Sequence, residues 1–299
     1  MEIDLVLPYV DMSKKNWQQI YYATNLKLGR CVSESNRYRQ LLDLKYMLRC
    51  IDKFCPFVRT LFLVVQTRDQ VPDYVKESSR LKIIEHKDII PEELLPTFNS
   101  STIELHIHKI PDLSEHFIYI NDDMYPLNYL TMSDFFTEDG KPKINVALRT
   151  QTINVYRLFL KNSENFVKRI LNISDSTQDN QFYRDGHSWT PMRKSHLEML
   201  YNFDSTLKDS CTPFRDKKNL VQQVATYYEY FTDNLAPRTI KTKYWDFKKD
   251  TKLCDFLNGD YHIVCINDSG LKVGLLSQMR NLRTWFQRIV PDKSERYEK

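Results

Sequence analysis

The sequence predicts an α/β fold with a mostly parallel, Rossmann-like sheet, helices on both faces and a helical insert. Short apolar runs with the length of buried strands recur along the 299 residues, and stretches with helical spacing lie between them. In the first part of the chain the order is strand, helix, strand, strand, helix, strand, which is typical of parallel sheets. The length suits one domain over residues 1–299 that buries a substantial core.

The strands are assigned to apolar runs that end in polar turn residues. The first run, residues 3–10, is followed by Asp-Met-Ser, and the run at 116–121 leads into two aspartates. Further buried strands are expected at residues 58–66, 81–86 and 261–266.

The helices are assigned where apolar residues recur three and four positions apart. This pattern predicts a helix over 36–54 that Ser35 or Asn36 caps, and a helix near 100–109 with an Asn-Ser-Ser run at its start. Residues 150–180 are more polar and partly helical, and we interpret them as the insert or cap. Further helices are expected near residues 191–202, 215–231 and 273–289.

Charge and composition exclude several classes of protein. The formal net charge of +4 is too small to argue for nucleic-acid binding. No leader opens the chain and no apolar run approaches a membrane span, and none of the six cysteines forms a C-x-x-C pair. We therefore expect a cytoplasmic protein with reduced thiols. The basic stretch at 241–252 is interpreted as a solvated loop, with a docking patch for an anionic partner or a membrane as the alternative.

Acidic residues follow two of the predicted strands. Asn121, Asp122 and Asp123 come at the end of the strand at 116–121, and Asn267 and Asp268 follow the strand at 261–266. In an open α/β sheet, ligands bind outside the carboxyl ends of the strands. Two carboxylates there can hold a hard divalent cation that also binds a diphosphate. Successive side chains of a strand point to opposite faces, so both aspartates reach one ion only if the chain turns. A plain turn or helix cap is the alternative.

Other polar residues are candidates for a site that binds phosphate. The chain has six glycines, none spaced for a phosphate-binding loop, so arginine, lysine or a metal ion must bind any phosphate. Arg37 and Arg215 fall at predicted helix starts, where the helix macrodipole disfavours a positive charge. A bound phosphate would offset this cost, and for Arg37 a surface ion pair is the alternative. His187 lies in a polar loop and suits a general base, although a lone loop histidine is more often a surface residue. Asp4 lies inside an apolar strand, where a carboxylate needs a partner or a cation unless it is near the exposed start.

Four blocks of the sequence, taken in order, match the conserved regions of one known family. IDLVLPYVDMSKKNW (3–17) is similar to the first region, and the stretch from Arg37 through LPTFNSSTIELHIHKIPDLSEHFIYINDDMY closely resembles the second. HSWTPMRKS (187–195) with PFR (213–215) resembles the third, and CINDS (265–269) with PDKSERYEK (291–299) resembles the fourth. By this resemblance the chain is identified as a member of the Stealth family of hexose-1-phosphate transferases. Leu7-Pro8-Tyr9 and Met12 depart from the family's pattern in the first loop.

The resemblance also implies site residues and a metal ion. By position, the family's essential residues fall on Asp4, Asp123, His187 and Arg215. Motif positions whose separate roles are open, and which we expect to bind substrate, are occupied by Arg37, Asn99, Glu104, His108 and Asn121. A Mg²⁺ or Mn²⁺ ion is expected to bridge the donor's diphosphate to Asp123, with Asp122 or Asp268 helping.

The activity implied by the resemblance is transfer of a hexose-1-phosphate from a UDP-sugar to a hydroxyl of a glycan or glycolipid. The sugar is expected to be an N-acetylhexosamine, UMP leaves, and the product belongs to a bacterial capsule or other cell-surface polysaccharide. Arg215 and Arg37 would neutralise phosphate oxygens and His187 would take the acceptor's proton, with Asp4 or an acidic neighbour as the alternative base.

Two other functions stay open at this point. A metal-dependent glycosyltransferase that releases UDP would use the same glycosyltransferase-A-like sheet edge. A non-catalytic module that binds glycans or nucleotides would need no base. We expect no nucleic-acid partner, and we expect association with the inner face of the cell membrane; the sequence does not determine the oligomeric state.

Overall fold

Strand β1 (Ile3–Pro8) lies at the centre of a five-stranded sheet with the order β3-β2-β1-β4-β8. The structure is a computed structural model that describes residues 1–31, 38, 40, 42–174, 178, 180–246, 259–267 and 275–299. The other strands of this sheet are β2 (Val58–Val65), β3 (Leu81–Glu85), β4 (His116–Tyr119) and β8 (Thr190–Arg193). The pairs β1–β2, β2–β3 and β1–β4 are parallel and β4–β8 is antiparallel, which confirms the mostly parallel sheet.

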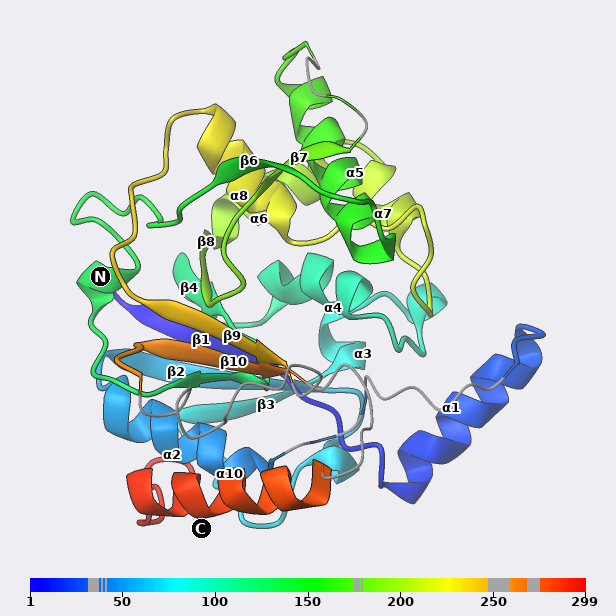
Figure 1. Ribbon diagram of the computed structural model, residues 1–299. Helices are drawn as coiled ribbons and strands as arrows, with labels where there is room; N and C mark the ends of the chain where they lie inside the picture. The colour runs from blue at the N-terminus through cyan, green and yellow to red at the C-terminus, as the bar shows by residue number, and fades with distance from the viewer. Residues whose placement is uncertain are drawn as a thin grey trace.

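Helices cover both faces of this sheet, as the sequence predicted. Alternate residues of β1 enter two different cores: Ile3, Leu5 and Leu7 pack on one face, and Val6 packs on the other. The first core is closed by α2 (Leu44–Phe54) and α10 (Leu275–Ile289), which lie side by side below the sheet in Figure 1. The second core is closed by α3 (His86–Ile89), α4 (Ser100–His106), α6 (Lys194–Phe203) and α8 (Gln223–Phe231).

Two smaller sheets complete the strands that the structure describes. Strand β10 (Ile263–Asn267) lies between β5 (Met124–Pro126), to which it is antiparallel, and β9 (Thr242–Asp246), to which it is parallel. Strands β6 (Ala147–Thr150) and β7 (Gln181–Arg184) form an antiparallel ribbon. The remaining described helices are α1 (Lys15–Lys27), α5 (Val155–Ile170) and α7 (Thr206–Ser210), with 3₁₀ turns at Arg68–Gln70, Glu92–Leu94, Ile107–Lys109 and Met132–Asp134. None of the described helices is both long and apolar enough to cross a membrane.

Three helix boundaries differ from the sequence prediction. Helix α2 starts at Leu44 rather than near residue 36, because the carboxylate of Asp43 caps it by accepting a hydrogen bond from the Lys45 N–H. Residues 190–193 form a strand before α6, because they pair with the free edge of β4. Helix α8 starts only at Gln223, so Arg215 does not lie at a helix start and the macrodipole argument made for it was wrong.

Three histidines are buried in the neutral form. Burial lowers the pKa of His86 and of His108 to about 3 and that of His106 to about 4. The Nδ1 atom of His106 lies 2.7 Å from the Thr102 carbonyl and its Nε2 lies 2.8 Å from the Tyr201 hydroxyl. A neutral ring fits these two partners, because Nδ1–H donates to the carbonyl and Nε2 accepts from the hydroxyl.

The buried histidines predict a loss of stability in mild acid. Each folded-state pKa lies below the unfolded value near 6.5, so the unfolded chain binds more protons as the pH falls. The free energy of unfolding is therefore expected to fall between about pH 6.5 and pH 4, by up to about 1.4 kcal/mol per pH unit for each histidine. Urea unfolding at several pH values in this range gives the free energy of unfolding as a function of pH. In His108→Phe this free energy should change less steeply with pH, by the equivalent of about one proton. An equal pH dependence of the free energy of unfolding in the wild type and in His108→Phe would contradict this account.

Candidate active site

A cavity of about 1150 Å³ lies at the carboxyl ends of the central strands. Pro8 at the end of β1, Tyr119 at the end of β4 and Asn267 at the end of β10 all line it. Its other walls come from α4, from the β6–β7 ribbon and α5, and from the segment at 184–188. This is the position at which open α/β sheets bind their ligands, and it agrees with the sequence prediction.

The acidic run after β4 lies in this cavity. Asn121, Asp122 and Asp123 all line it, and the Met124 N–H donates to the Asn121 carbonyl at 3.1 Å, which closes a turn. The turn that the sequence required for both carboxylates to approach one place is therefore present. It leads directly into β5, where the Ile266 N–H of β10 donates to the Asp123 carbonyl at 2.8 Å.

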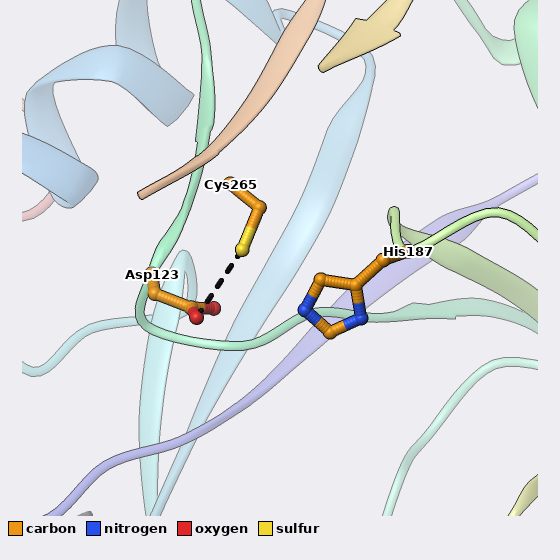
Figure 2. Close-up of side chains that lie close together, drawn as sticks. All are labelled: Asp123, His187 and Cys265. Atoms are coloured by element: carbon orange, nitrogen blue, oxygen red, sulfur yellow. Dashed lines mark hydrogen bonds between the residues drawn. The ribbon is translucent and has the colours of Figure 1, made fainter. Parts of the chain in front are cut away.

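Three side chains from distant parts of the chain meet at this turn (Figure 2). One ligand atom each of Asp123, His187 and Cys265 lie within 4.8 Å of one another, and the Cys265 thiol donates to Asp123 Oδ2 at 3.3 Å. Cys265 comes from β10, and His187 from the loop between β7 and β8, where its ring packs edge-on against Tyr244 at 5.5 Å. The other oxygen of Asp123, Oδ1, is buried and has no hydrogen-bond partner among the described residues.

Burial disfavours the ionised form of the acidic groups at this turn. It raises the pKa of Asp122 to about 7, with repulsion from Asp123 as the second cause. Burial also raises the pKa of Asp123, opposed by His187 and by the Cys265 hydrogen bond. The pKa of the Cys265 thiol lies well above its ordinary value because the thiol is buried beside these carboxyl groups. A cation placed among them would offset the cost of the buried negative charge.

The residues of the cluster fit a divalent cation. Asp123 Oδ1 is an oxygen donor without a protein partner, and the protonated Cys265 thiol already holds Oδ2. A hard ion such as Mg²⁺ or Mn²⁺ prefers oxygen ligands and keeps waters or substrate oxygens in its other positions. The aspartate suits such an ion and leaves His187 free. Asp122 is not among the three converging side chains, although its carboxyl group is close enough to that of Asp123 for the two charges to repel.

The cluster also offers the mixed ligand set that soft ions favour. Nitrogen, sulfur and oxygen donors together suit Zn²⁺ and Co²⁺ better than Mg²⁺. We expect Co²⁺ to bind here with loss of the thiol proton and to give the near-ultraviolet band of a cobalt–thiolate bond. Titration of the metal-free protein should show this band in the wild type and in Cys31→Ser, an exposed cysteine elsewhere, and should show none in Cys265→Ser. A band that persists in Cys265→Ser would place the ion at another thiol.

Arg215 lies on a different wall of the cavity, near the start of α4. Its Nη2 donates to the Ser100 hydroxyl at 3.1 Å, and its Nε is buried without a partner among the described residues. Glu104 also lines the cavity; burial raises its pKa, and the charge of Arg215 opposes that rise. The Tyr119 hydroxyl donates to Glu104 Oε1 at 3.1 Å and lies 2.9 Å from the Asn121 side-chain oxygen, which links this wall to the acidic turn.

Asn99 supports this wall from behind. It is fully buried, caps α4 by accepting from the Ser101 N–H, and donates to Asn219 Oδ1 at 3.0 Å and to the Thr212 carbonyl at 3.3 Å. It does not line the cavity. The structure therefore gives Asn99 a role in holding the loop that carries Arg215, and it does not support direct contact with substrate.

Besides Asn99, two predicted site residues that the structure describes, His108 and Asp4, are not brought to the cavity. His108 packs against the Tyr201 ring, 4.7 Å away, and lines a separate hollow beside Lys109 and Lys208. Asp4 is fully buried at the amino end of β1, the opposite end from the cavity, at about 13 Å from Pro8 by the rise of a strand. Arg37 and Asp268 lie outside the described residues.

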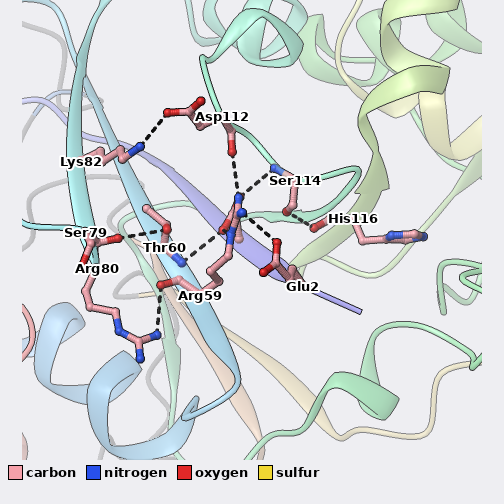
Figure 3. Close-up of polar contacts among 10 residues, drawn as sticks. Glu2, Arg59, Thr60, Ser79, Arg80, Lys82, Asp112, Ser114 and His116 are labelled. Carbon is pink, nitrogen blue, oxygen red and sulfur yellow. Dashed lines mark hydrogen bonds and ion pairs between the residues drawn. The ribbon is translucent and has the colours of Figure 1, made fainter.

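Asp4 accepts hydrogen bonds from Arg59, Thr60 and Ser114, three donors that Figure 3 labels. Arg59 donates to it from Nε at 2.9 Å and from Nη2 at 2.5 Å, and the N–H groups of Thr60 and Ser114 donate at 3.1 and 2.8 Å. These bonds tie β1 to β2 and to the segment before β4. The buried carboxylate that suggested a catalytic group is explained by this structural network.

Sequence reasoning missed several residues of the site. Cys265 was noticed only as part of the block CINDS, although it stands two residues before Asn267 and thus on the same face of the strand. Tyr244, Tyr156 and the cavity-lining arginines Arg149, Arg157 and Arg184 gave no sequence signal, because nothing in their local pattern indicates that they face the aspartates.

Comparison with known proteins identifies the family. The family model described as Stealth protein CR2, conserved region 2, matches residues 37–144. The exopolysaccharide phosphotransferase cps2G of Lactiplantibacillus plantarum is 32% identical over 98% of this chain and 96% of its own length. The chain belongs to the Stealth family. The receptor polysaccharide phosphotransferase WefC of Streptococcus oralis is 30% identical over 98% of both chains.

Residues of this Stealth protein's cavity come from inside and outside the matched region. Asn121, Asp122 and Asp123 lie within conserved region 2, whereas His187, Arg215 and Cys265 lie beyond it. Among solved structures, a galactosyltransferase LgtC in complex with donor and acceptor sugar analogs aligns over 98% of both chains with 9% identity and a TM-score of 0.45. Mouse xyloside xylosyltransferase 1 aligns over 89% of this chain and 97% of its own with 12% identity and a TM-score of 0.40.

Proposed function

We propose that this protein transfers a hexose-1-phosphate from a UDP-sugar to a hydroxyl of a glycan or glycolipid, with release of UMP. The observation that carries the proposal is the approach of His187 to Asp123 in a cavity that also holds Arg215. Phosphoryl transfer needs positioning and neutralisation of charge more than covalent chemistry, and a base, a carboxylate and a guanidinium in one cavity can supply these.

The reaction forms one bond and breaks one bond at the phosphorus that carries the sugar. The acceptor oxygen attacks this phosphorus and loses its proton to a ring nitrogen of His187. The bond from the same phosphorus to the oxygen that bridges the donor's two phosphates breaks, and UMP leaves with that oxygen. Arg215 faces the transferred phosphoryl group, since its Nε is a buried donor that lacks a protein partner among the described residues.

The proposed cofactor is Mg²⁺ or Mn²⁺, and Asp123 would hold it through Oδ1. When bound, the ion would neutralise negative charge on the donor's diphosphate. Asp122, whose pKa is raised, would provide a second carboxyl group beside the ion.

The nucleotide that is released tests the proposal. The protein would be incubated with UDP-N-acetylhexosamines, Mg²⁺ and polysaccharide acceptors, and the products separated by chromatography. We expect UMP, and we expect its formation to stop with a chelator and in Asp123→Ala. Release of UDP would instead mean that the bond at the anomeric carbon breaks, as in a glycosyltransferase. Binding of the donor without any released nucleotide would favour a binding module.

We also propose that the reaction belongs to the synthesis of a bacterial capsule or another cell-surface polysaccharide. The relatives at 27–32% identity over nearly their whole length are named as exopolysaccharide, capsular and receptor polysaccharide phosphotransferases, which supports this setting. The donor would then be cytoplasmic and the acceptor would stand at the inner face of the cell membrane. Cell fractionation with and without loss of the cell's lipid-linked glycans would test this location.

A further inference from the structure

Three arginines line the cavity on the side of the β6–β7 ribbon and α5. We call Arg149, Arg157 and Arg184 the arginine wall. Arg149 belongs to β6, Arg184 to β7 and Arg157 to the first turn of α5, so all three come from the region between the acidic turn and His187. The proposed transfer uses none of them. The ribbon and α5 stand above the sheet in Figure 1.

The register of the ribbon puts two of these arginines on one face. Ala147 pairs with Arg184, and Arg149 pairs with Phe182. Paired residues of an antiparallel ribbon share a face, and so do residues two apart along one strand. Arg149 and Arg184 are therefore diagonal neighbours on the same face, which is the face that lines the cavity.

None of the three arginines forms an ion pair with a carboxylate of the described residues. Within the part of the chain that the structure describes, Arg184 donates a long bond of 3.4 Å to the Gln151 side chain, and Arg157 donates to the Thr152 carbonyl. Asp185, next in the chain, lines the same cavity; burial raises its pKa, and the charges of Arg238, His187 and Arg184 oppose that rise. Guanidinium groups that face a shared space without forming ion pairs with described residues suit an anionic ligand.

Amide oxygens that can accept hydrogen bonds line the same cavity. Gln222 and Gln223 are both more than nine-tenths buried and line the cavity, and the Oε1 atom of each has no partner among the described residues. Gln223 is tied to this place because its Nε2 donates to the Tyr156 hydroxyl at 3.4 Å. Unpartnered buried acceptors need donors, and sugar hydroxyl groups are donors of the right kind.

We propose that the arginine wall, with Gln222 and Gln223, binds the acceptor and selects one that carries a negative charge: a sugar with a phosphodiester or a carboxylate close to the accepting hydroxyl. The amide oxygens accept hydrogen bonds from hydroxyl groups of the sugar, and Arg149 and Arg184 bind the anionic group. This inference rests on the proposed function, because it assigns the wall to the acceptor and leaves Arg215 for the phosphate of the donor.

Equilibrium binding of small saccharides tests the inference without requiring turnover. The probes are one disaccharide in three forms: neutral, with a methyl phosphodiester, and with a uronic acid carboxylate. Calorimetry is performed on the full chain with UMP and Mg²⁺ present, so that the donor site is filled. We expect the anionic forms to bind at least about tenfold more tightly than the neutral form, since hydrogen bonds to charged groups are strong. The tighter of the two anionic forms identifies the anionic group.

Matched arginine variants decide where the probe binds. Arg149→Gln/Arg184→Gln should remove most of the preference for the anionic form and leave binding of the neutral form within about twofold. Arg283→Gln, an exposed arginine on α10 far from the cavity, should leave the preference unchanged. Equal affinity for all three forms, or a preference that survives the double variant, would overturn the inference.

The two proposals can fail separately. If the preference is lost in Arg215→Gln and not in the double variant, the probe occupies the donor's phosphate position and the arginine wall has another role. The protein could release no UMP under any condition while the double variant still abolishes binding of the anionic forms. That result would support the anion site and contradict the proposed transfer.

Discussion

Replacing His187 by alanine is expected to lower UMP release by about 10²- to 10⁴-fold, the usual contribution of a general base. His187 is the basic side chain of the cluster with Asp123 and Cys265, and in the proposed reaction it takes the acceptor's proton. The measurement is the steady-state rate of UMP release at saturating UDP-sugar and Mg²⁺. The affinity for the donor should change much less than the rate, because His187 acts on the acceptor.

A second histidine outside the cavity provides the control. His262 accepts a hydrogen bond from the Lys241 N–H in the segment before β10 and does not line the cavity. His262→Ala should therefore retain the wild-type rate within about twofold. If His187→Ala loses less than about tenfold while its circular dichroism and donor affinity are unchanged, the base is another group, and Glu104 and Asp122 become the candidates in the cavity.

Replacing Asp4 by alanine is expected to lower the free energy of unfolding by about 2–5 kcal/mol, since each buried donor left without its acceptor costs about 1–3 kcal/mol. The loss leaves the N–H groups of Thr60 and Ser114 without their acceptor and removes the partner of Arg59. Urea unfolding measures the change. Lys82→Ala, which breaks the neighbouring surface pair with Asp112 visible in Figure 3, should cost less than about 1 kcal/mol.

Kinetics separate this structural role from a catalytic one. Asp4→Asn keeps the shape of the side chain and one acceptor oxygen, so enough protein should fold for an assay. Per folded molecule its rate of UMP release should stay within about threefold of the wild type, because Asp4 lies at the end of β1 away from the cavity. A stable Asp4→Asn protein with a loss of 10²-fold or more would restore the catalytic assignment that the family resemblance implied.

Most of the sheet could be predicted from local patterns. The runs that became β1, β2, β3 and β4 are short and apolar, and burial of both faces of a parallel sheet produces that pattern directly. Helix starts were predicted less well, since a cap depends on one side chain. The cap of α2 is Asp43 and not Ser35 or Asn36. For α8, the helical spacing of apolar residues begins near residue 220, before the helix itself starts at Gln223.

Local sequence patterns suffice to place acidic residues at the carboxyl ends of strands, because strand ends and turns are local features. These patterns could not determine which residues join them. Cys265 is 142 positions from Asp123, and their contact depends on the pairing of β10 with β5. The same limit applies to Asp4, a buried carboxylate in the sequence that could be catalytic or structural. The fold resolves this choice, because the partner that neutralises Asp4 is Arg59 on a neighbouring strand. Which side chains meet across a sheet depends on strand order and register.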